Sequence, residues 1–409
     1  MVKKIVNQFI YQFGNYILPF LIIPFLINKL SIAVYKDFVV IQSLVLFFAV
    51  LINYGLDLFG VRYISNNVKH LRKCKSFLYI SILSRLCIFI FCSFFLLVSL
   101  MALTKPDLLY WLLCFFWMLS FVFQSNWYLQ GCGDFKLITF YGLLPKLIVY
   151  PFVFILVNND NDAWVYLFLC AIANYASNIL MMIHIRRKLN VVAFKRTNLL
   201  RNVWIFLVKG WYIFLSQASV TLISYANIFF LPLVLEPKSF VVFSTAERIV
   251  KVLSITTTPI LNVIFPHISS LIENNKQRVF IMISRISLFS LIVFLLCYTL
   301  YVFIGYYLIQ LIFPTISQEL YSVLLLLLFN VFFVFQNNLF GTQIGLNYGK
   351  DKSFTKIIAI NGILNIIAMP VFSKLYHLHG TILTSLRIQL SILICMYMLA
   401  KKCGYKFKV

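Results

Sequence analysis

The chain consists of long apolar segments separated by short polar ones. Each apolar segment runs for roughly twenty residues, the length a helix needs to cross the ~30 Å hydrocarbon core of a bilayer. Hydrophobicity is continuous along each segment rather than alternating, which favours helices over barrel strands. About twelve segments meet this description: 8–28, 38–60, 77–103, 107–129, 137–157, 164–185, 210–235, 239–268, 280–310, 321–346, 355–373 and 380–400. The pattern predicts an all-α polytopic membrane protein.

Composition supports this prediction and removes several alternatives. Hydrophobic residues make up 62% of the 409 positions and charged residues 11%, a balance that a soluble core of this size could not solvate. The first segment contains Pro19 and Pro24 and lacks a small-residue cleavage site, so we expect a first span rather than a removable signal peptide. The nine cysteines are scattered without a C-x-x-C pair or a histidine cluster, and we expect no metal, disulfide framework or cofactor.

The longest hydrophilic interruption, roughly 186–209, follows the sixth apolar segment. It divides the spans into two sets of six, which both begin on the same side of the membrane. We therefore expect an N-terminal six-helix lobe over 1–192, a cytoplasmic linker over 193–209 and a C-terminal six-helix lobe over 210–409.

The positive charges lie on one predicted side of the membrane. The net charge is +24, and the Lys and Arg residues gather in 61–76, in 186–209 and after Lys401, whereas 158–162 has acids and no base. This asymmetry is the positive-inside pattern for an even number of spans, and it predicts that both termini are cytoplasmic. It also explains the basic balance without nucleic acid, which we do not expect as a partner.

Charged residues inside the apolar segments are the main candidates for a functional site. Glu247, Arg248 and Lys251 lie in the eighth segment, where a charge costs at least ~2.5 kcal/mol to insert, so such residues usually face a partner or water. Glu247 and Lys251 are four apart and can pair on one helix face. Two interpretations stay open: a polar cavity lined by these residues, or a structural ion pair with snorkelled side chains.

Two further cations lie deep in apolar segments. Lys146 is in the fifth segment between Pro145 and Pro151, which are tolerated where neighbours or cavity water satisfy the freed backbone groups. Arg387 lies about seven residues into the last segment. For both, the alternatives are again a ligand cavity or a structural pair.

Three other charges lie nearer to the predicted span ends. Arg85 and Arg285 are within two turns of cytoplasmic ends, and we expect their side chains to snorkel to the interface. Asp57, close to the cytoplasmic end of the second segment, pairs with a cation or binds a coupling proton or sodium ion.

Deep cations outnumber deep carboxylates, which favours an anionic passenger. A phosphate loop of the form G-x-x-x-x-G-K-[ST], a G-x-S-x-G motif and an H-E-x-x-H motif are all missing, so the chain reads as a transporter and not an enzyme. A cation-coupled multidrug antiporter is an alternative that would need a carboxylate-rich cavity. A membrane polysaccharide polymerase or ligase is another, and it would need a large outside loop with Arg or His.

Particular motifs resemble the Wzx-type polysaccharide (O-antigen) flippases of the multidrug/oligosaccharidyl-lipid/polysaccharide exporter superfamily. The ordered motifs are Gly14-Asn15-Tyr16-Ile17-Leu18-Pro19, Asn53-Tyr54-Gly55-Leu56-Asp57, Trp127-Tyr128-Leu129-Gln130-Gly131, Ala246-Glu247-Arg248-Ile249-Val250 with Pro259 and Pro266, and Gln336-Asn337-Asn338-Leu339-Phe340-Gly341-Thr342-Gln343. They occur in both halves of the chain in the order expected for that family.

The resemblance implies two lobes around a central, alternately opened cavity in the cytoplasmic (inner) membrane. The passenger would be an undecaprenyl-diphosphate-linked oligosaccharide repeat unit for O-antigen, lipopolysaccharide or capsule synthesis, with a polysaccharide polymerase and a chain-length regulator as partners. The residues that would receive the diphosphate or acidic sugars are Arg248, Lys251, Lys146 and Arg387. Asp57 and Glu247 would couple transport to H+ or Na+. The first span has no cation, unlike that of the peptidoglycan-precursor flippases in the same superfamily.

Overall fold

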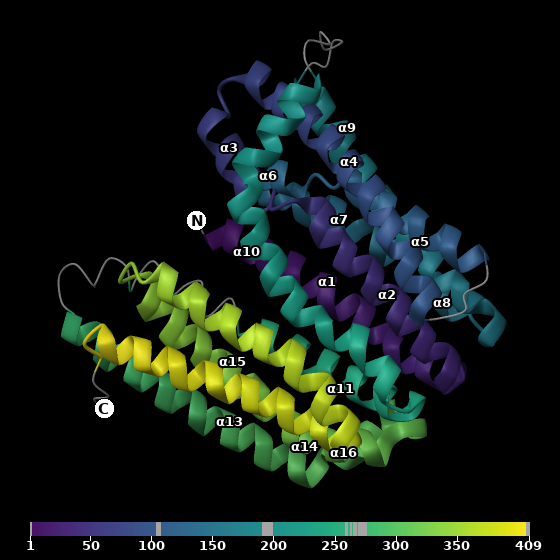
Figure 1. Ribbon diagram of the computed structural model, residues 1–409, viewed down its shortest axis with the longest axis vertical. Helices are drawn as coiled ribbons and strands as arrows, with labels where there is room; N and C mark the ends of the chain where they lie inside the picture. The colour runs from purple at the N-terminus through teal and green to yellow at the C-terminus, as the bar shows by residue number, and fades with distance from the viewer. Residues whose placement is uncertain are drawn as a thin grey trace. The chain divides into compact units, whose positions relative to one another are not determined.

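Helices account for every regular element in the described part of the chain, as the sequence predicts (Figure 1). The computed structural model describes residues 2–103, 108–189, 199–257, 261, 264, 268 and 276–405. The chain divides into two compact units, Met1–Tyr225 and Ala226–Val409, called the N-terminal and the C-terminal unit below. The lobe boundary predicted at 193–209 stays a prediction, and 190–198 lie outside the described residues.

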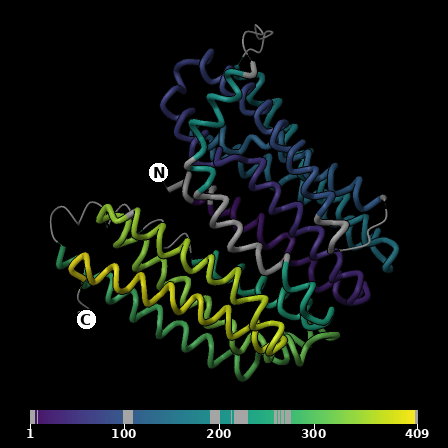
Figure 2. The backbone as a smooth tube through the Cα atoms, in the orientation of Figure 1, coloured from purple at the N-terminus to yellow at the C-terminus, as the bar shows by residue number. Residues whose placement is uncertain are grey.

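The N-terminal unit is a bundle of long helices with two short ones inserted between them. Its elements are α1 (Val2–Lys29), α2 (Ile32–Asn53), α3 (Phe59–Asn67), α4 (Leu71–Leu103), α5 (Leu108–Ser120), η1 (Phe121–Phe123), α6 (Asn126–Cys132), α7 (Phe135–Val149), α8 (Pro151–Leu156), η2 (Asp160–Asp162), α9 (Ala163–Leu189) and the first part of α10 (Leu199–Val234). Helix α7 packs between α1 and α9, and α2 packs against α4 and α5. The same path can be followed from purple to teal in Figure 2.

The C-terminal unit begins inside α10 and ends with a very long helix. Its further elements are α11 (Pro237–Thr256), α13 (Lys276–Ile312), η3 (Pro314–Ile316), α14 (Ser317–Leu327), α15 (Phe329–Asn338), the π-helical segment η4 (Leu339–Leu346) and α16 (Asp351–Lys402). Helix α16 has 52 residues and a non-helical backbone at His377 (φ 50°, ψ −135°). At about 1.5 Å per residue it is far longer than one ~30 Å crossing, and it is long enough for the two spans predicted at 355–373 and 380–400.

Exposed apolar side chains show why these helices require lipid. On α13, Phe289, Leu296 and Phe303 are 68%, 65% and 78% exposed, and their spacing of seven places them on one helix face. A stripe of this size would be unfavourable in water and is ordinary against acyl chains. Nine segments of the described chain have the length and composition of membrane spans. The chain is therefore a multi-pass membrane protein, and the predicted count of about twelve spans stays a prediction.

The second span ends in a tight turn that leads directly to the short helix α3. Tyr54 (φ 50°) and Gly55 (φ 71°) both take the left-handed conformation there. A Cβ on Gly55 would lie 3.2 Å from the backbone nitrogen of Phe214, so glycine allows α10 to approach the turn. The Tyr54 ring stacks on Phe214 at a centroid distance of 4.4 Å, and its hydroxyl donates to the Leu207 carbonyl at 2.8 Å. The first part of α10 is thus packed onto the N-terminal unit.

The fourth predicted span is interrupted in the structure. Helix α5 ends at Ser120, one 3₁₀ turn follows, and α6 begins only at Asn126. Trp127, directly after the interruption, is fully buried in the core of the N-terminal unit together with Leu56 and Ile64. Irregular backbone at membrane depth is tolerated where protein covers it, which is the case here.

Candidate functional site

Lys146 lies on α7 and forms a hydrogen bond with α1. Its ammonium donates to the side-chain carbonyl of Asn15, and the side chain of Lys146 is half-buried. Within the described part of the chain the ammonium bonds to this neutral amide and to no carboxylate. An ammonium has three donors, and Asn15 accepts one of them. The geometry leaves Lys146 with both charge and donors available for an anion.

Tyr11 and Asn126 extend the contacts of Lys146 to a second helix. Asn15 donates to the Tyr11 carbonyl at 2.8 Å, and the Asn126 amide donates to the Tyr11 hydroxyl at 2.6 Å. The close approach of α1 and α7 depends on Gly142, because a Cβ there would overlap the Tyr11 ring. We call Lys146, Asn15, Tyr11 and Asn126 the Lys146 cluster. It joins α1, α6 and α7 within the N-terminal unit.

Asp57 lies near this cluster, in the turn after Asn53 and outside the candidate spans. Its carboxylate accepts a hydrogen bond from the Asn53 amide at 2.5 Å. Desolvation by the surrounding protein raises the pKa of Asp57 above its ordinary 3.8, while the Asn53 hydrogen bond and the positive charge of Arg85 oppose that rise. The Asp57 carboxylate also acts electrostatically on Tyr11. Asp57 is therefore a group that gains a proton more easily than an ordinary aspartate.

The expectation for Arg85 is wrong. Its side chain does not snorkel to the membrane interface, because it is 0% exposed and points into the N-terminal unit. Its guanidinium donates to the carbonyls of Ser81 at 3.2 Å, Phe121 at 3.3 Å and Gln124 at 2.6 Å. The last two carbonyls lie at the interruption of the fourth span, and the Phe121 carbonyl also accepts from the Gln124 backbone N–H at 3.2 Å. The position of Arg85 in the sequence predicted how far it lies from the end of its span. It could not show that the carbonyls of Phe121 and Gln124 lie next to the Arg85 side chain.

The cations predicted in the C-terminal unit occupy two helices. Glu247 and Arg248 are half-buried on α11, and Lys251, one turn further along, is exposed. Arg387 on α16 is exposed, and its guanidinium lies 6.0 Å from the centre of the Phe372 ring on the same helix. That ring contact is a cation–π arrangement that leaves the donors of Arg387 available. The structure does not assign a ligand to these side chains, and their role stays a proposal.

The structure thus places two of the predicted site residues, Lys146 and Asp57, in the same part of the N-terminal unit. Lys146 bonds to Asn15, which bonds to Tyr11, and the charge of Asp57 acts on Tyr11 without a hydrogen bond among the described contacts. It adds Asn15 and Asn126, uncharged residues that the search for buried charges overlooked. A signal was present: each of these residues is a strong hydrogen-bonding group within or beside an apolar segment, where a polar side chain needs a partner. The partner itself could not be read from the sequence, because it lies about 110 to 130 positions away.

The chain is similar in sequence to two proteins described as transporters. The chain is 24% identical over 397 residues to a candidate O-antigen transporter of Escherichia coli strain K12, covering 94% of this chain and 92% of that one. It is 26% identical over 278 residues to a candidate O-antigen transporter of Shigella dysenteriae, covering 66% of this chain and 68% of that one.

Two solved structures share the fold. The lipid II flippase MurJ, in an inward closed conformation, matches with a TM-score of 0.70 at 12% identity, over 98% of this chain and 88% of that chain. An inward-facing multidrug resistance transporter of the MATE family, in the MOP superfamily, matches with a TM-score of 0.68 at 12% identity, over 95% and 99%. At such identities the likeness shows the fold alone. Residues 1–272, more than half of the chain, match the family described as polysaccharide biosynthesis protein, and the chain belongs to that family.

Proposed function

We propose that the protein is a flippase that moves lipid-linked oligosaccharide repeat units across the cytoplasmic (inner) membrane by alternating access. Membership of the polysaccharide biosynthesis family, relatives described as O-antigen transporters and a fold shared with a lipid II flippase all support this function. The passenger is a polyprenyl diphosphate that carries a few sugars. It is needed for a surface polysaccharide, and the protein acts as a transporter and not as an enzyme.

The observation that carries the proposal is Lys146. A cation inside an apolar segment is expensive, and here its hydrogen-bond partner is the neutral Asn15. A structural ion pair, the main alternative for such a lysine, would need a carboxylate at that place. A lysine that keeps its charge and two donors suits a phosphate group, which it recognises as a compact point charge.

The remaining predicted site residues act together with the binding of phosphate at Lys146. Arg248, Lys251 and Arg387 bind the diphosphate or acidic sugars from the C-terminal unit, and the polyprenyl tail stays in lipid. Asp57 and Glu247 couple transport to H+ or Na+. Both termini are cytoplasmic, in keeping with the positive-inside pattern. A polysaccharide polymerase and a chain-length regulator receive the repeat units after transport.

The test is export in a strain that lacks this gene. Deletion should leave lipid-linked repeat units on the cytoplasmic leaflet, and the wild-type gene should restore surface polysaccharide. Lys146→Met should restore at least tenfold less polysaccharide than wild type, whereas Lys146→Arg should keep a substantial part because the charge is retained. Lys136→Met is the matched control, since Lys136 lies exposed on the same helix. All variants must be compared at equal protein levels in the membrane.

Two outcomes would contradict the proposal. Normal surface polysaccharide in the deletion strain, in the absence of a second copy of the gene, would remove the transport role. Full restoration by Lys146→Met would remove Lys146 from the passenger site. If deletion instead raised only the sensitivity to cationic drugs, the multidrug antiporter would be the better interpretation.

A further inference from the structure

A charged side chain, that of Arg85, bonds to the backbone at the interruption of the fourth span. Between α5 and α6 the regular helical bonding stops, and the carbonyls of Phe121 and Gln124 turn toward α4. There Arg85 Nη1 donates to both of them, at 3.3 and 2.6 Å, while Nε remains bonded to the Ser81 carbonyl of its own helix at 3.2 Å. The Trp127 ring nitrogen donates to the same Gln124 carbonyl at 3.1 Å. The Gln124 carbonyl, which lies in the break, is thus bonded to one side chain on α4 and one on α6.

This arrangement uses the shape of the guanidinium and not only its charge. Arg presents several donors in a rigid fork, and here two nitrogens bond to two different helical segments at once. Arg85 and Asp57 are close enough to interact electrostatically, yet the bonds of the guanidinium go to backbone carbonyls. Nη2 is buried and has no hydrogen-bond partner among the described residues. A residue needed only for packing would not require a buried charge.

The interruption is connected to the Lys146 cluster by a continuous set of contacts. Asn126, the first residue of α6, follows Gln124 by two positions, and its amide donates to the Tyr11 hydroxyl. Tyr11 and Asn15 lie one turn apart on α1 and are joined by a hydrogen bond, and Asn15 accepts from Lys146. The Gln124 carbonyl and the Asn126 amide are thus two positions apart in the same interrupted segment, one bonded to Arg85 and the other to Tyr11. The hydrogen bonds of Arg85 within the described residues go to Ser81, Phe121 and Gln124 and not to Tyr11 or Lys146.

We propose that Arg85 is a positioning residue for the anion site at Lys146, acting through the interrupted fourth span and Asn126. The inference rests on the proposed function, in which Lys146 receives a phosphate group of the passenger. Arg85 would fix the carbonyl of Gln124, Asn126 would then hold Tyr11, and α1 would present Asn15 to the ammonium in one orientation. The geometry that binds the anion is in this way set on α4, a helix that does not contribute to the site.

A binding experiment tests this on the full chain in lipid nanodiscs, with inorganic pyrophosphate as the probe. Arg85→Met and Asn126→Ala should each weaken pyrophosphate binding about tenfold, and the double variant should be hardly weaker than either single one, because both changes break the same connection. Arg285→Met is the matched control, since Arg285 is exposed on α13. Multiplied effects in the double variant, or wild-type affinity in Arg85→Met, would overturn the proposal.

Arg85→Lys separates geometry from charge. Lysine keeps the positive charge near Asp57 but cannot bond to the carbonyls of Ser81, Phe121 and Gln124 with a fork. We expect pyrophosphate affinity close to that of Arg85→Met. Wild-type affinity in Arg85→Lys would show that only the charge balance with Asp57 matters, and it would overturn a positioning role.

Amide hydrogen exchange tests the same connection without a ligand. Arg85→Met should speed exchange by about tenfold or more in 121–126 and also in 11–15, whereas Asn126→Ala should speed it only in 11–15. Unchanged exchange in 11–15, or an equal rise throughout the N-terminal unit, would overturn the proposal, the second by showing general destabilisation. If wild-type protein binds no pyrophosphate and Lys146→Met is fully active, the proposed role of Lys146 in binding the passenger fails, and exchange still decides whether Arg85 positions this cluster.

Discussion

The fourth and the tenth predicted spans are both interrupted helices, and they satisfy their backbone in different ways. In the N-terminal unit, the carbonyls of Phe121 and Gln124 at the break both accept from one buried guanidinium, that of Arg85. In the C-terminal unit, α14, α15 and the π-helical η4 succeed one another. Tyrosine hydroxyls on α13 donate to the Tyr321 and Leu325 carbonyls of α14, and neutral amides on α15 and η4 bond to other parts of the unit.

These amides bond to several parts of the C-terminal unit. Gln336 on α15 donates to Ser290 at 3.0 Å and accepts from Ser287 at 3.0 Å, both on α13. Gln343 on η4 donates to the Leu261 carbonyl at 3.0 Å, and Asn337 donates to the Gln389 side chain on α16 at 3.1 Å. The break in the fourth span thus has a buried charge among its donors, beside the neutral side chains of Trp127 and Asn178. The tenth span has neutral donors, apart from the exposed pair of Glu319 with Lys238. We therefore expect single substitutions at the break in the fourth span to have larger effects than single substitutions in the tenth span.

The largest effect is expected at Arg248. If C-terminal charges serve the passenger, Arg248→Gln should lower polysaccharide export about tenfold or more, whereas Arg248→Lys, which keeps the charge and loses the planar fork, should fall much less. Surface polysaccharide measured at equal membrane protein levels checks this. Should Arg248→Gln instead lower the amount of protein, the arginine would be half of a structural pair, since its partner would be left buried and uncompensated. Equal export by Arg248→Gln and wild type would remove it from the site.

The next effect is on stability and is expected at Gln336, in the tenth span. Gln336→Met keeps the side-chain volume and removes hydrogen bonds that Ser287 and Ser290 can partly replace within their own helix. We expect a loss of about 1 kcal/mol in the free energy of unfolding, near the value for interhelical hydrogen bonds in membrane proteins. Thermal unfolding of purified protein against Arg85→Met gives the comparison. A loss as large as that of Arg85→Met would contradict the distributed arrangement in the C-terminal unit.

A smaller effect depends on pH and concerns Asp57. Because desolvation raises the pKa of Asp57 above 3.8, the folded protein binds this proton up to a higher pH than the unfolded chain, and ionisation weakens the fold above the folded pKa. Asp57→Asn cannot ionise. It should therefore be more stable than wild type at pH 7, with a gain that shrinks as pH falls toward about 4.

Midpoints of thermal unfolding for both proteins across that pH range measure the Asp57 effect. Glu236→Gln is a suitable control for the loss of a carboxylate, because Glu236 is exposed and its side chain makes no capping hydrogen bond to α11. A gain that does not vary with pH, or a loss at pH 7, would show that the hydrogen bond with Asn53 and the charge of Arg85 outweigh desolvation.

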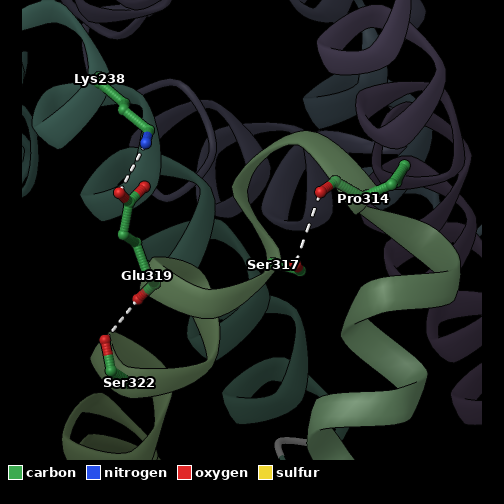
Figure 3. A network of polar contacts seen from close by, with 5 residues as sticks. All are labelled: Lys238, Pro314, Ser317, Glu319 and Ser322. Carbon is green, nitrogen blue, oxygen red and sulfur yellow. Dashed lines mark hydrogen bonds and ion pairs between the residues drawn. The ribbon is translucent and has the colours of Figure 1, made fainter.

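The smallest effect is expected at an ion pair exposed to solvent. Lys238 on α11 and Glu319 on α14 approach to 2.6 Å, and Figure 3 shows the two side chains pointing toward each other. Their side chains are 49% and 44% exposed. Glu319→Gln should change the free energy of unfolding by less than ~0.5 kcal/mol and should weaken the salt dependence of that energy. A change above ~1 kcal/mol would show that exposure is a poor guide to the value of a charge in this protein.

The sequence predicted the class of fold and the depth of its charges, but not the contacts of those charges. Apolar length predicted the helical spans because lipid allows few alternatives. Depth along a helix singled out Lys146, whose role stays a prediction. It failed for Arg85, because two of the three carbonyls that Arg85 bonds to lie where the fourth span breaks. No proline or glycine between 121 and 125 announced that break. Asn126 and Tyr11 were missed for a related reason, because the hydrogen bond between them joins helices that are far apart in the sequence.

Helix α13 has a consequence for the membrane in which the protein works. Its 37 residues would extend about 55 Å, and its exposed apolar residues run from Leu288 to Ile312. That stretch of about 37 Å exceeds the ~30 Å hydrocarbon thickness of an average bilayer, so the helix must tilt or the lipid must thicken around it. Acyl-chain length therefore enters the energetics of this protein directly. A thinner membrane would require α13 to tilt further from the membrane normal, and a thicker one would allow a smaller tilt.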